Sequence, residues 1–419
     1  MFEIARRLFC VAAVALLVAF ATATPSAAAD PIKIGFSMSL TGPGAPAGRQ
    51  ILLALEIWRD DVNIKGGLLG RPVALAYYDD QSNPATVPGI YAKLLSVDKA
   101  DLLVGPYSTN MTAAAMPAIM QQKKLTISLL AIGVNDKFKY PNYFSMVPVG
   151  PEGVKAFSHG YFELAAAQAP KPKTVAIIAA DSEFARTSAD GARENAKALG
   201  FDIIYDKTYP PATTDFAPVI RAVQAANADV IFVAAYPLDT VGIVRAANEV
   251  GFVPKMFGGT MVGLLVTPIK VQLGPLMNGI VIMESFVPAS TFNFPGLHDL
   301  FKTYGERAKG QQVDPFGYGF TPFAYAAGQV LATAVTETKS LDNEVLAKYI
   351  HGHQFSTVAG EISFNEAGDW AKPRTVFTQF QDVQAGNLDQ FRDTKKQPIL
   401  WPKEYQTGTI IYPYSEAKK

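Results

Sequence analysis

The chain alternates short apolar runs with longer amphipathic runs, and it does so in two successive stretches. The apolar runs suit strands buried on both faces, whereas the amphipathic runs have the i, i+3, i+4 spacing of helices. The expected strands cover residues 32–39, 73–78, 101–104 and 125–130 in the first stretch and 174–180, 201–205 and 229–234 in the second. Strands that alternate with helices form parallel sheets with helices on both faces. The predicted fold class is therefore α/β, with two doubly wound parallel-sheet lobes separated near residues 138–151.

The first residues have the pattern of an export signal. Arg6 and Arg7 precede an apolar run at 8–23, and three alanines at 27–29 precede Asp30. The apolar run is short for a membrane span, which needs about 20 residues, and the small residues suit a cleavage site. We predict that residues 1–29 are a signal peptide and that the mature protein is periplasmic.

The composition argues against several classes of function. The only cysteine, Cys10, lies in the predicted signal peptide, so we expect a mature chain without disulfides or thiol chemistry. The 37 basic and 37 acidic residues balance, unlike those of a protein that binds nucleic acid or anionic membranes. His351 and His353 form only a weak metal-binding pattern, and no hydrolase motif is present. We expect no cofactor, no metal and no catalytic residue, and hence no enzyme.

Two loops that follow predicted strands are candidate ligand-binding segments, because parallel α/β sheets bind ligands at the carboxyl ends of their strands. The loop at 40–48 reads LTGPGAPAG; its glycine spacing differs from the dinucleotide fingerprint, and Pro43 removes an amide that a phosphate would need. It suits a stiff wall of a ligand cleft, with Pro43 beside the ligand. The loop at 105–109 ends where a helix is expected to begin. Free amides and a hydroxyl there attract a carboxylate, although Ser108 or Thr109 can equally be an ordinary helix cap.

Several segments, taken in order, resemble the leucine/isoleucine/valine-type periplasmic binding proteins of ABC importers. They read IGFSMSLTGPGAPAG, NIKGGLLGRPVALAYYDDQSNP and LLVGPYST, followed by DSEFARTSADGARENAKALG, DVIFVAAYPLDTVGIVRAANEVG and FGGT. No single motif is specific to the family, but the ordered set covers nearly the whole mature chain. The resemblance implies a type I periplasmic binding fold that closes over its ligand like a Venus flytrap.

The same resemblance implies the domain organisation and the partner. One lobe would comprise residues 31–149 with 287–355, and the other residues 150–283 with 356–419, joined by three crossover segments. Ligand contacts that only the closed state makes to both lobes would supply the free energy of closure. The closed form, which we expect to be a monomer, would dock on the membrane permease of an ABC importer.

The resemblance also implies which first-lobe residues meet the ligand. Family members hold a ligand carboxylate with the hydroxyl and the amides that follow a Gly-Pro pair, which here are those of Ser108 with its neighbours Tyr107 and Thr109. After the next strand they carry a small residue and then a threonine that helps to hold an α-ammonium. Ala131 matches the small residue, whereas Ile132 stands in place of the threonine.

The second lobe of family members contributes two aromatic residues, matched by Phe184 and Tyr236, and an acid that pairs with the α-ammonium. The loop that should carry this acid reads Gly-Gly-Thr260-Met261-Val-Gly and contains none. An ammonium buried in a closed cleft without a partner is strongly destabilised. The departure therefore predicts a ligand that lacks an α-ammonium.

We accordingly expect a small carboxylate, and specifically an aromatic acid, as the ligand. Phe184, Tyr236, Met261 and Tyr107 would form a flat apolar pocket suited to a ring, beside Thr260. Arg49 in the opening loop would be a further charge partner.

Two alternatives remain. A shift of the alignment by one or two residues would let Asp181, Glu183 or Glu284 pair with the ammonium of a branched-chain amino acid. A ligand sensor that signals to a membrane receptor would use the same fold.

Overall fold

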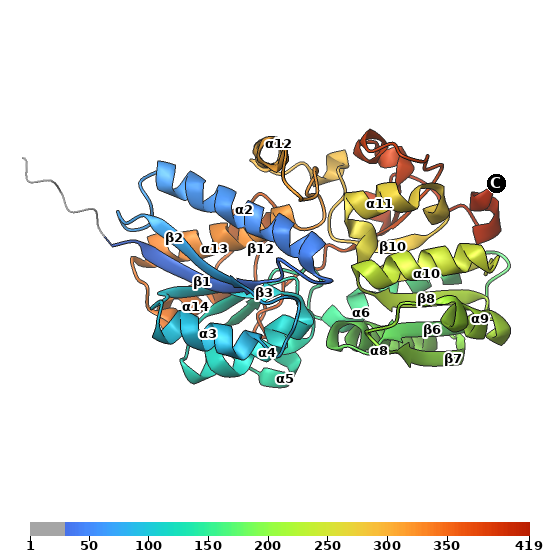
Figure 1. Ribbon diagram of the computed structural model, residues 1–419, viewed down its shortest axis with the longest axis horizontal. Helices are drawn as coiled ribbons and strands as arrows, with labels where there is room; N and C mark the ends of the chain where they lie inside the picture. Colours follow the sequence, from blue (N-terminus) through green and yellow to red (C-terminus); the bar gives the residue numbers. More distant parts are fainter. Residues whose placement is uncertain (1–29) are drawn as a thin grey trace, which may run out of the picture.

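The computed structural model describes residues 30–419, so the predicted signal peptide and Cys10 lie outside the described residues. Two large sheets lie side by side along the long axis of the molecule, each with helices packed on it (Figure 1). Within residues 30–419, none of the helices has both the length and the apolar character that a membrane span requires. The predicted α/β class with two doubly wound lobes is confirmed.

The first lobe is built on a five-stranded sheet in the order β2-β1-β3-β4-β5, with every pair parallel. Its strands are β1 (Ile32–Met38), β2 (Val73–Asp79), β3 (Leu102–Tyr107), β4 (Thr126–Leu129) and β5 (Tyr143–Ser145). Its main helices are α2 (Ala45–Ile64), α3 (Val87–Ser96), α4 (Thr109–Gln121), α12 (Leu297–Ala308), α13 (Thr321–Thr338) and α14 (Asn343–Gly352), with the short α5 (Val134–Phe138). β3 and β4 are buried along their whole length, which accounts for their apolar sequence.

The second lobe is built on a seven-stranded sheet in the order β14-β13-β10-β9-β8-β6-β7. Its strands are β6 (Thr174–Ala180), β7 (Asp202–Tyr209), β8 (Val230–Ala235), β9 (Met256–Met261), β10 (Val281–Glu284), β13 (Val376–Gln379) and β14 (Ile399–Trp401). Its helices include α6 (Gly153–Ala156), α7 (His159–Ala166), α8 (Glu183–Ala198), α9 (Ala217–Ala226), α10 (Pro237–Glu249) and α11 (Thr267–Leu273), with the 3-10 turns η1 (Val262–Leu265) and η4 (Asp389–Arg392). The strands from β6 to β10 are parallel, and two antiparallel strands, β13 and β14, extend the sheet.

The chain passes between the two sheets after β5, after β10 and before β13. The first and third passages run together, because the Arg374 amide donates to the Pro148 carbonyl at 2.7 Å. The small hairpin β11–β12 (Phe355–Thr357 and Gly360–Ile362) and the residues after it pack on the first lobe. There the Ser145 amide donates to the Gly368 carbonyl at 2.8 Å.

The largest helix contact of the first lobe joins α2 to α13. Trp58 of α2 is 1% exposed, and its ring lies directly against the backbone of Gly328 in α13. A Cβ built on Gly328 would lie 2.3 Å from the indole, far inside van der Waals contact. The glycine is therefore required by the close approach of the two helices.

Gly328→Ala should destabilise the protein. Alanine favours a helix over glycine by about 1 kcal/mol, but overpacking against Trp58 should outweigh this and leave a net loss of about 1–3 kcal/mol. Urea unfolding followed by circular dichroism would measure it. The matched control is Gly89→Ala in α3, where an added Cβ has nothing within 4 Å and should be neutral or stabilising. Equal stability of the parent and Gly328→Ala would contradict the tight contact.

Candidate ligand-binding site

The carboxyl ends of the parallel strands in both lobes border a cleft between the lobes. Two cavities occupy this cleft, and Tyr107, Ser108 and Tyr236 line both of them. The first, here called the inner cavity, has a volume of about 40 Å³. The second, here called the outer cavity, has a volume of about 490 Å³. The shared residues place the junction of the two cavities at the ends of β3 and β8.

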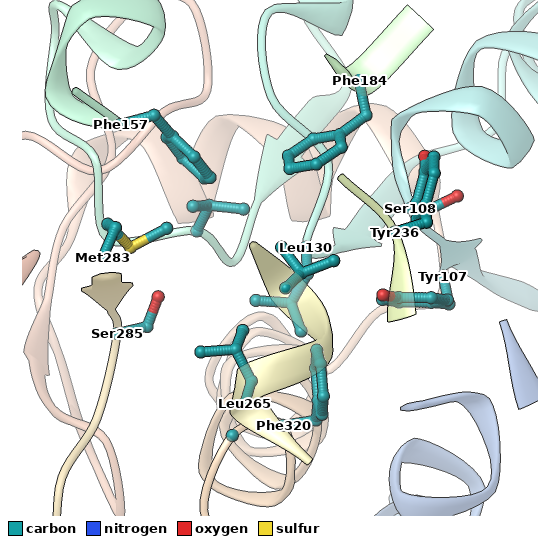
Figure 2. A pocket seen from close by; sticks show the side chains of 13 residues that line it. Tyr107, Ser108, Leu130, Phe157, Phe184, Tyr236, Leu265, Met283, Ser285 and Phe320 are labelled. Carbon is teal, nitrogen blue, oxygen red and sulfur yellow. The ribbon is translucent and has the colours of Figure 1, made fainter. Parts of the chain in front are cut away.

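The inner cavity is mainly apolar. Figure 2 shows Tyr107, Ser108 and Tyr236 on one side and Met283 with Ser285 on the other. Aromatic rings and aliphatic side chains form the remaining wall, and the rings pack on their neighbours. The ring pairs are Phe157–Phe184 at 6.1 Å, Phe184–Tyr236 at 5.3 Å and Tyr107–Phe320 at 5.6 Å between centroids. Such edge-on and tilted contacts stabilise a fixed wall.

The outer cavity has walls from both lobes and more polar groups. The opening loop of the first lobe contributes Pro43 and Gly44. The second lobe contributes Phe216 and the polar side chains Ser182, Thr213, Thr214 and Asp239. The expected position of Pro43 in a cleft wall agrees with this arrangement.

Ser108 has an unusual backbone conformation at the start of α4. Its φ is 78° and its ψ is 158°, a region that residues other than glycine rarely occupy and that costs about 1–3 kcal/mol. Its amide donates to the Leu129 carbonyl at 3.2 Å. Its side chain makes no capping hydrogen bond to α4, so the hydroxyl is not used as an ordinary helix cap.

The backbone amides at the start of α4 are a second set of possible donors. The first intrahelical hydrogen bond runs from the Thr112 amide to the Ser108 carbonyl at 3.0 Å. The amides of residues 109–111 precede it and carry the positive end of the helix dipole. Together with the Ser108 hydroxyl they make a neutral donor set that can bind a carboxylate.

Tyr236 supplies a further donor at the junction. Its hydroxyl oxygen is buried and has no hydrogen-bond partner among the described residues. Burial raises the pKa of the Tyr236 phenol well above its ordinary value, so the hydroxyl stays protonated at neutral pH. A buried donor without an acceptor costs about 1–3 kcal/mol, which a ligand oxygen would remove.

The structure brings some of the sequence-predicted residues together at the cleft. Tyr107, Ser108, Phe184, Tyr236 and Pro43 all line one cavity or both. These residues come from four separate strand-to-helix or loop segments of the two lobes. Their roles toward a ligand stay predictions.

The other predicted residues support the site from behind or lie outside it. Thr109 accepts a hydrogen bond from the Ile132 amide at 3.1 Å, which ties α4 to the loop that carries Ala131. Thr260 shares a hydrogen bond with Ser188 at 2.6 Å, and Met261 beside it is 1% exposed. The five predicted residues of this group do not line either cavity: Thr109, Ala131, Ile132, Thr260 and Met261.

Arg49 does not line either cavity. Its guanidinium donates to the Leu40 carbonyl at 3.0 Å and to the Gln312 carbonyl at 3.2 Å. It therefore fixes the opening loop to the segment before α13. In this arrangement Arg49 would not contact a ligand bound in either cavity.

Charged side chains are scarce around the cleft. Among the described residues that line the two cavities, Asp239 is the single acid, and no lysine, arginine or histidine is present. The Tyr209 hydroxyl donates to Asp239 at 3.2 Å. Burial raises the pKa of the Asp239 carboxyl to about 6. Sequence reasoning missed this residue, although it follows the predicted aromatic Tyr236 by one helical turn.

The acids considered for an ammonium ligand lie elsewhere. Glu284 is the last residue of β10 and lies in sequence between the cavity residues Met283 and Ser285, but it does not line either cavity itself. It lies 3.5 Å from Lys270 and accepts a 2.6 Å hydrogen bond from Gln397. Asp181 and Glu183 are exposed and do not line either cavity.

A hydrogen bond closes one rim of the cleft between the lobes. The Asn110 side chain on α4 accepts from the Phe184 amide at the start of α8, at 3.1 Å. It thereby satisfies an amide that α8 itself leaves unpaired. The bond joins the two lobes and exists only while they are close.

The two histidines of the H-x-H pattern make local contacts. His351 lies within hydrogen-bond distance of the Pro141 and Asn365 carbonyls, and His353 stacks on Tyr349 with 3.8 Å between centroids. Within residues 30–419, the structure has no cluster of three or more metal-binding side chains.

The family follows from the sequence match to known proteins. The family model described as periplasmic binding protein matches residues 31–384. The chain belongs to the periplasmic binding protein family. A Leu/Ile/Val-binding protein homolog 7 from Brucella abortus is 24% identical over 340 residues, covering 78% of this chain and 83% of the relative. The Leu/Ile/Val-binding protein of Citrobacter freundii is 23% identical and covers 81% of this chain and 88% of the relative.

Solved structures share the type I fold with this periplasmic binding protein. A leucine binding protein from Thermotoga maritima has a TM-score of 0.73 at 18% identity, covering 84% of this chain and 99% of its own. A solute binding protein of an ABC transporter from R. palustris, in complex with 4-hydroxybenzoate, has a TM-score of 0.73 at 18% identity, covering 93% and 100%. Another from Rhodopseudomonas palustris, in complex with 3,4-dihydroxybenzoic acid, has a TM-score of 0.72 at 19% identity, covering 85% and 96%. These likenesses confirm the fold.

Asn110→Ala should shift the ligand-free protein toward an open state, because it removes the hydrogen bond between the lobes. Loss of one such bond, worth about 1 kcal/mol, should change an open-to-closed ratio by about fivefold. Small-angle scattering without ligand should give a larger radius of gyration for this variant. Asn110→Asp keeps an acceptor for the Phe184 amide and should scatter like the parent. Identical scattering curves for all three proteins would show that this hydrogen bond does not hold the lobes together.

Asp239→Asn should flatten the pH dependence of stability between pH 4 and pH 6. The folded-state pKa of Asp239, about 6, lies above the value of about 4 in the unfolded chain. The folded state then binds more protons in this interval, so its stability falls as the pH rises through it. Solvent screening limits the loss to the order of 1 kcal/mol. Urea unfolding at several pH values would measure the free energy of unfolding of the parent and the variant. Parallel plots of this free energy against pH would contradict a raised pKa of Asp239.

Proposed function

We propose that this periplasmic binding protein captures a small aromatic carboxylate in the cleft between its lobes and delivers it to the permease of an ABC importer. The carboxylate would accept hydrogen bonds from Ser108, from Tyr236 and from the amides at the start of α4. The single observation that carries the proposal is the buried Tyr236 hydroxyl without a partner, beside a Ser108 hydroxyl that does not cap its helix. The Tyr236 hydroxyl lacks an acceptor oxygen, and the Ser108 hydroxyl can donate beside it.

The size of the outer cavity supports an aromatic body for the ligand. An apolar cavity of about 150 Å³ accommodates benzene, and the outer cavity exceeds this severalfold at about 490 Å³. Its walls include the rings of Tyr107, Phe216 and Tyr236. A flat apolar ring would lie against them more favourably than a strongly hydrated group.

The lack of a basic residue does not argue against a carboxylate. Neutral donors at a helix start bind anions, and hydrogen bonds that involve a charged group are stronger than neutral ones. Binding through neutral donors also leaves no buried cation when the cleft is empty. Hinge closure would follow because a ligand held by Ser108 and Tyr236 contacts both lobes at once.

A branched-chain amino acid is the second candidate ligand, favoured by the names of the relatives from Brucella and Citrobacter. Such a ligand needs an acid near its ammonium. Glu284 is already held by Lys270 and Gln397, so this acid would have to be Asp239. A role as a sensor for a membrane receptor would use the same ligand but a different docking partner.

A thermal-shift screen of residues 30–419 separates the ligand candidates. We expect benzoates or phenylpropenoid acids to raise the melting temperature and leucine and valine to have little effect, because a ligand at 100 times its Kd stabilises by about 2.7 kcal/mol. Ser108→Ala and Tyr236→Phe should each weaken the binding of the best acid by about tenfold.

Ser96→Ala, an exposed serine on α3 outside the cleft, is the control and should bind like the parent. Strong stabilisation by leucine without any response to aromatic acids would contradict the proposed ligand class. Unchanged affinity in both cleft variants would remove their hydroxyls from the site.

A further inference from the structure

The two cavities differ in what they can hold. The inner cavity, at about 40 Å³, has room for little more than a water molecule or a small substituent, since one water needs about 10–15 Å³ and benzene about 150 Å³. The outer cavity has about 490 Å³. A ring whose carboxylate meets Ser108 and Tyr236 at the junction must therefore extend into the outer cavity.

The wall of the outer cavity carries one charge. Asp239 lies there among neutral side chains, and no lysine, arginine or histidine lines the cavity with it. Its side-chain partner is the Tyr209 hydroxyl, at 3.2 Å, and the Tyr236 backbone amide also stabilises the charged carboxylate. A carboxylate accepts more hydrogen bonds than these, because its two oxygens offer about four lone-pair sites. Acceptor capacity therefore remains on a wall that a ligand in the outer cavity would face.

A structural role, support of the Tyr236 amide at the start of α10, accounts for only part of this placement. An acid in the first turn of a helix stabilises it by about 0.3–1 kcal/mol when it is exposed to water. Asp239 is instead partly buried, and burial raises its pKa to about 6, which means that the folded protein holds the charge at a net cost in stability. A polar group that destabilises the empty protein is expected where a ligand compensates it.

We propose that Asp239 accepts a hydrogen bond from a hydroxyl or ammonium group at the end of the ligand remote from its carboxylate. The inference rests on the proposed function and narrows it. The ligand class becomes an aromatic carboxylate with a second, hydrogen-bond-donating substituent. Asp239 then selects this class, because a ligand without the donor leaves a buried carboxylate without its partner.

Paired ligands test the inference by calorimetry on residues 30–419. In each pair a methyl group replaces the donor at nearly the same shape: 4-hydroxybenzoate against 4-methylbenzoate, 4-(aminomethyl)benzoate against 4-ethylbenzoate, and 4-hydroxycinnamate against 4-methylcinnamate. The parent should bind at least one donor-bearing acid about tenfold or more tightly than its methyl analogue, because the bond involves a charged acceptor. The preferred donor, hydroxyl or ammonium, identifies the group that Asp239 binds.

Asp239→Asn should reduce this preference to within about threefold, because it weakens binding of the donor-bearing acid and removes the penalty that an unpaired carboxylate imposes on the methyl analogue. Glu249→Gln changes an exposed acid at the other end of α10 and should keep the parental preference. Tyr209→Phe removes the hydrogen bond to Asp239 but keeps its carboxylate, so the preference should persist. Rescue of the preference in Asp239→Glu would further support a direct contact.

Four outcomes would overturn the inference, and they show whether the proposed function fails with it. Equal binding of donor-bearing and methyl acids by the parent, or an undiminished preference in Asp239→Asn, rejects the role of Asp239 and leaves the proposed function intact. Loss of the preference in Tyr209→Phe to the same extent as in Asp239→Asn shows that Asp239 only orders that tyrosine. Failure of every aromatic acid to bind the parent rejects the proposed function and, with it, this inference.

Discussion

The turn between β3 and α4 is the constraint on which the candidate site depends. Ser108 occupies a backbone region that suits glycine, and its amide is held by the Leu129 carbonyl of the neighbouring strand. Gly105 permits this close pairing, since a Cβ there would lie 2.8 Å from Ser128. The turn places Tyr107, the Ser108 hydroxyl and the first amides of α4 at a single edge of the sheet. Strain stored in this way is common where a backbone is held ready for a ligand.

The energetics of ligand binding in the cleft should depend on the desolvation of neutral polar groups rather than on ion pairs. The buried ion pair near the hinge, Lys270 with Glu284, is turned into the second lobe and completed by Gln397. The cavities are left with hydroxyls, amides and aromatic rings, and with Asp239 as their one charge. Neutral donors bind an anion with a smaller penalty in the empty state than a buried cation would incur. A site of this kind distinguishes ligands by the polar groups that they leave unpaired.

Much of the fold and part of the site could be predicted from local pattern. The buried strands β3 and β4 are continuous apolar runs, and the helix beginning after Ser108 follows a strand directly. Side chains such as Ile132 and Met261 were placed by family position, yet both are buried behind the cavities. Matching strands and loops to the family gives the approximate backbone position of a residue. A shift of one residue along the chain, however, decides whether its side chain faces the cleft or the core.

The sequence by itself determined the α/β class, the two lobes and the segment at 105–109, because periodicity and turn residues act over a few neighbouring positions. Tertiary structure alone decided the partners that come from distant segments. Arg49 bonds to Gln312, and Asn110 bonds to Phe184 across the lobes. Asp239 lines the same cavity as Ser108. Such contacts depend on how two separately formed sheets meet, and no local pattern in the chain records the geometry of that meeting.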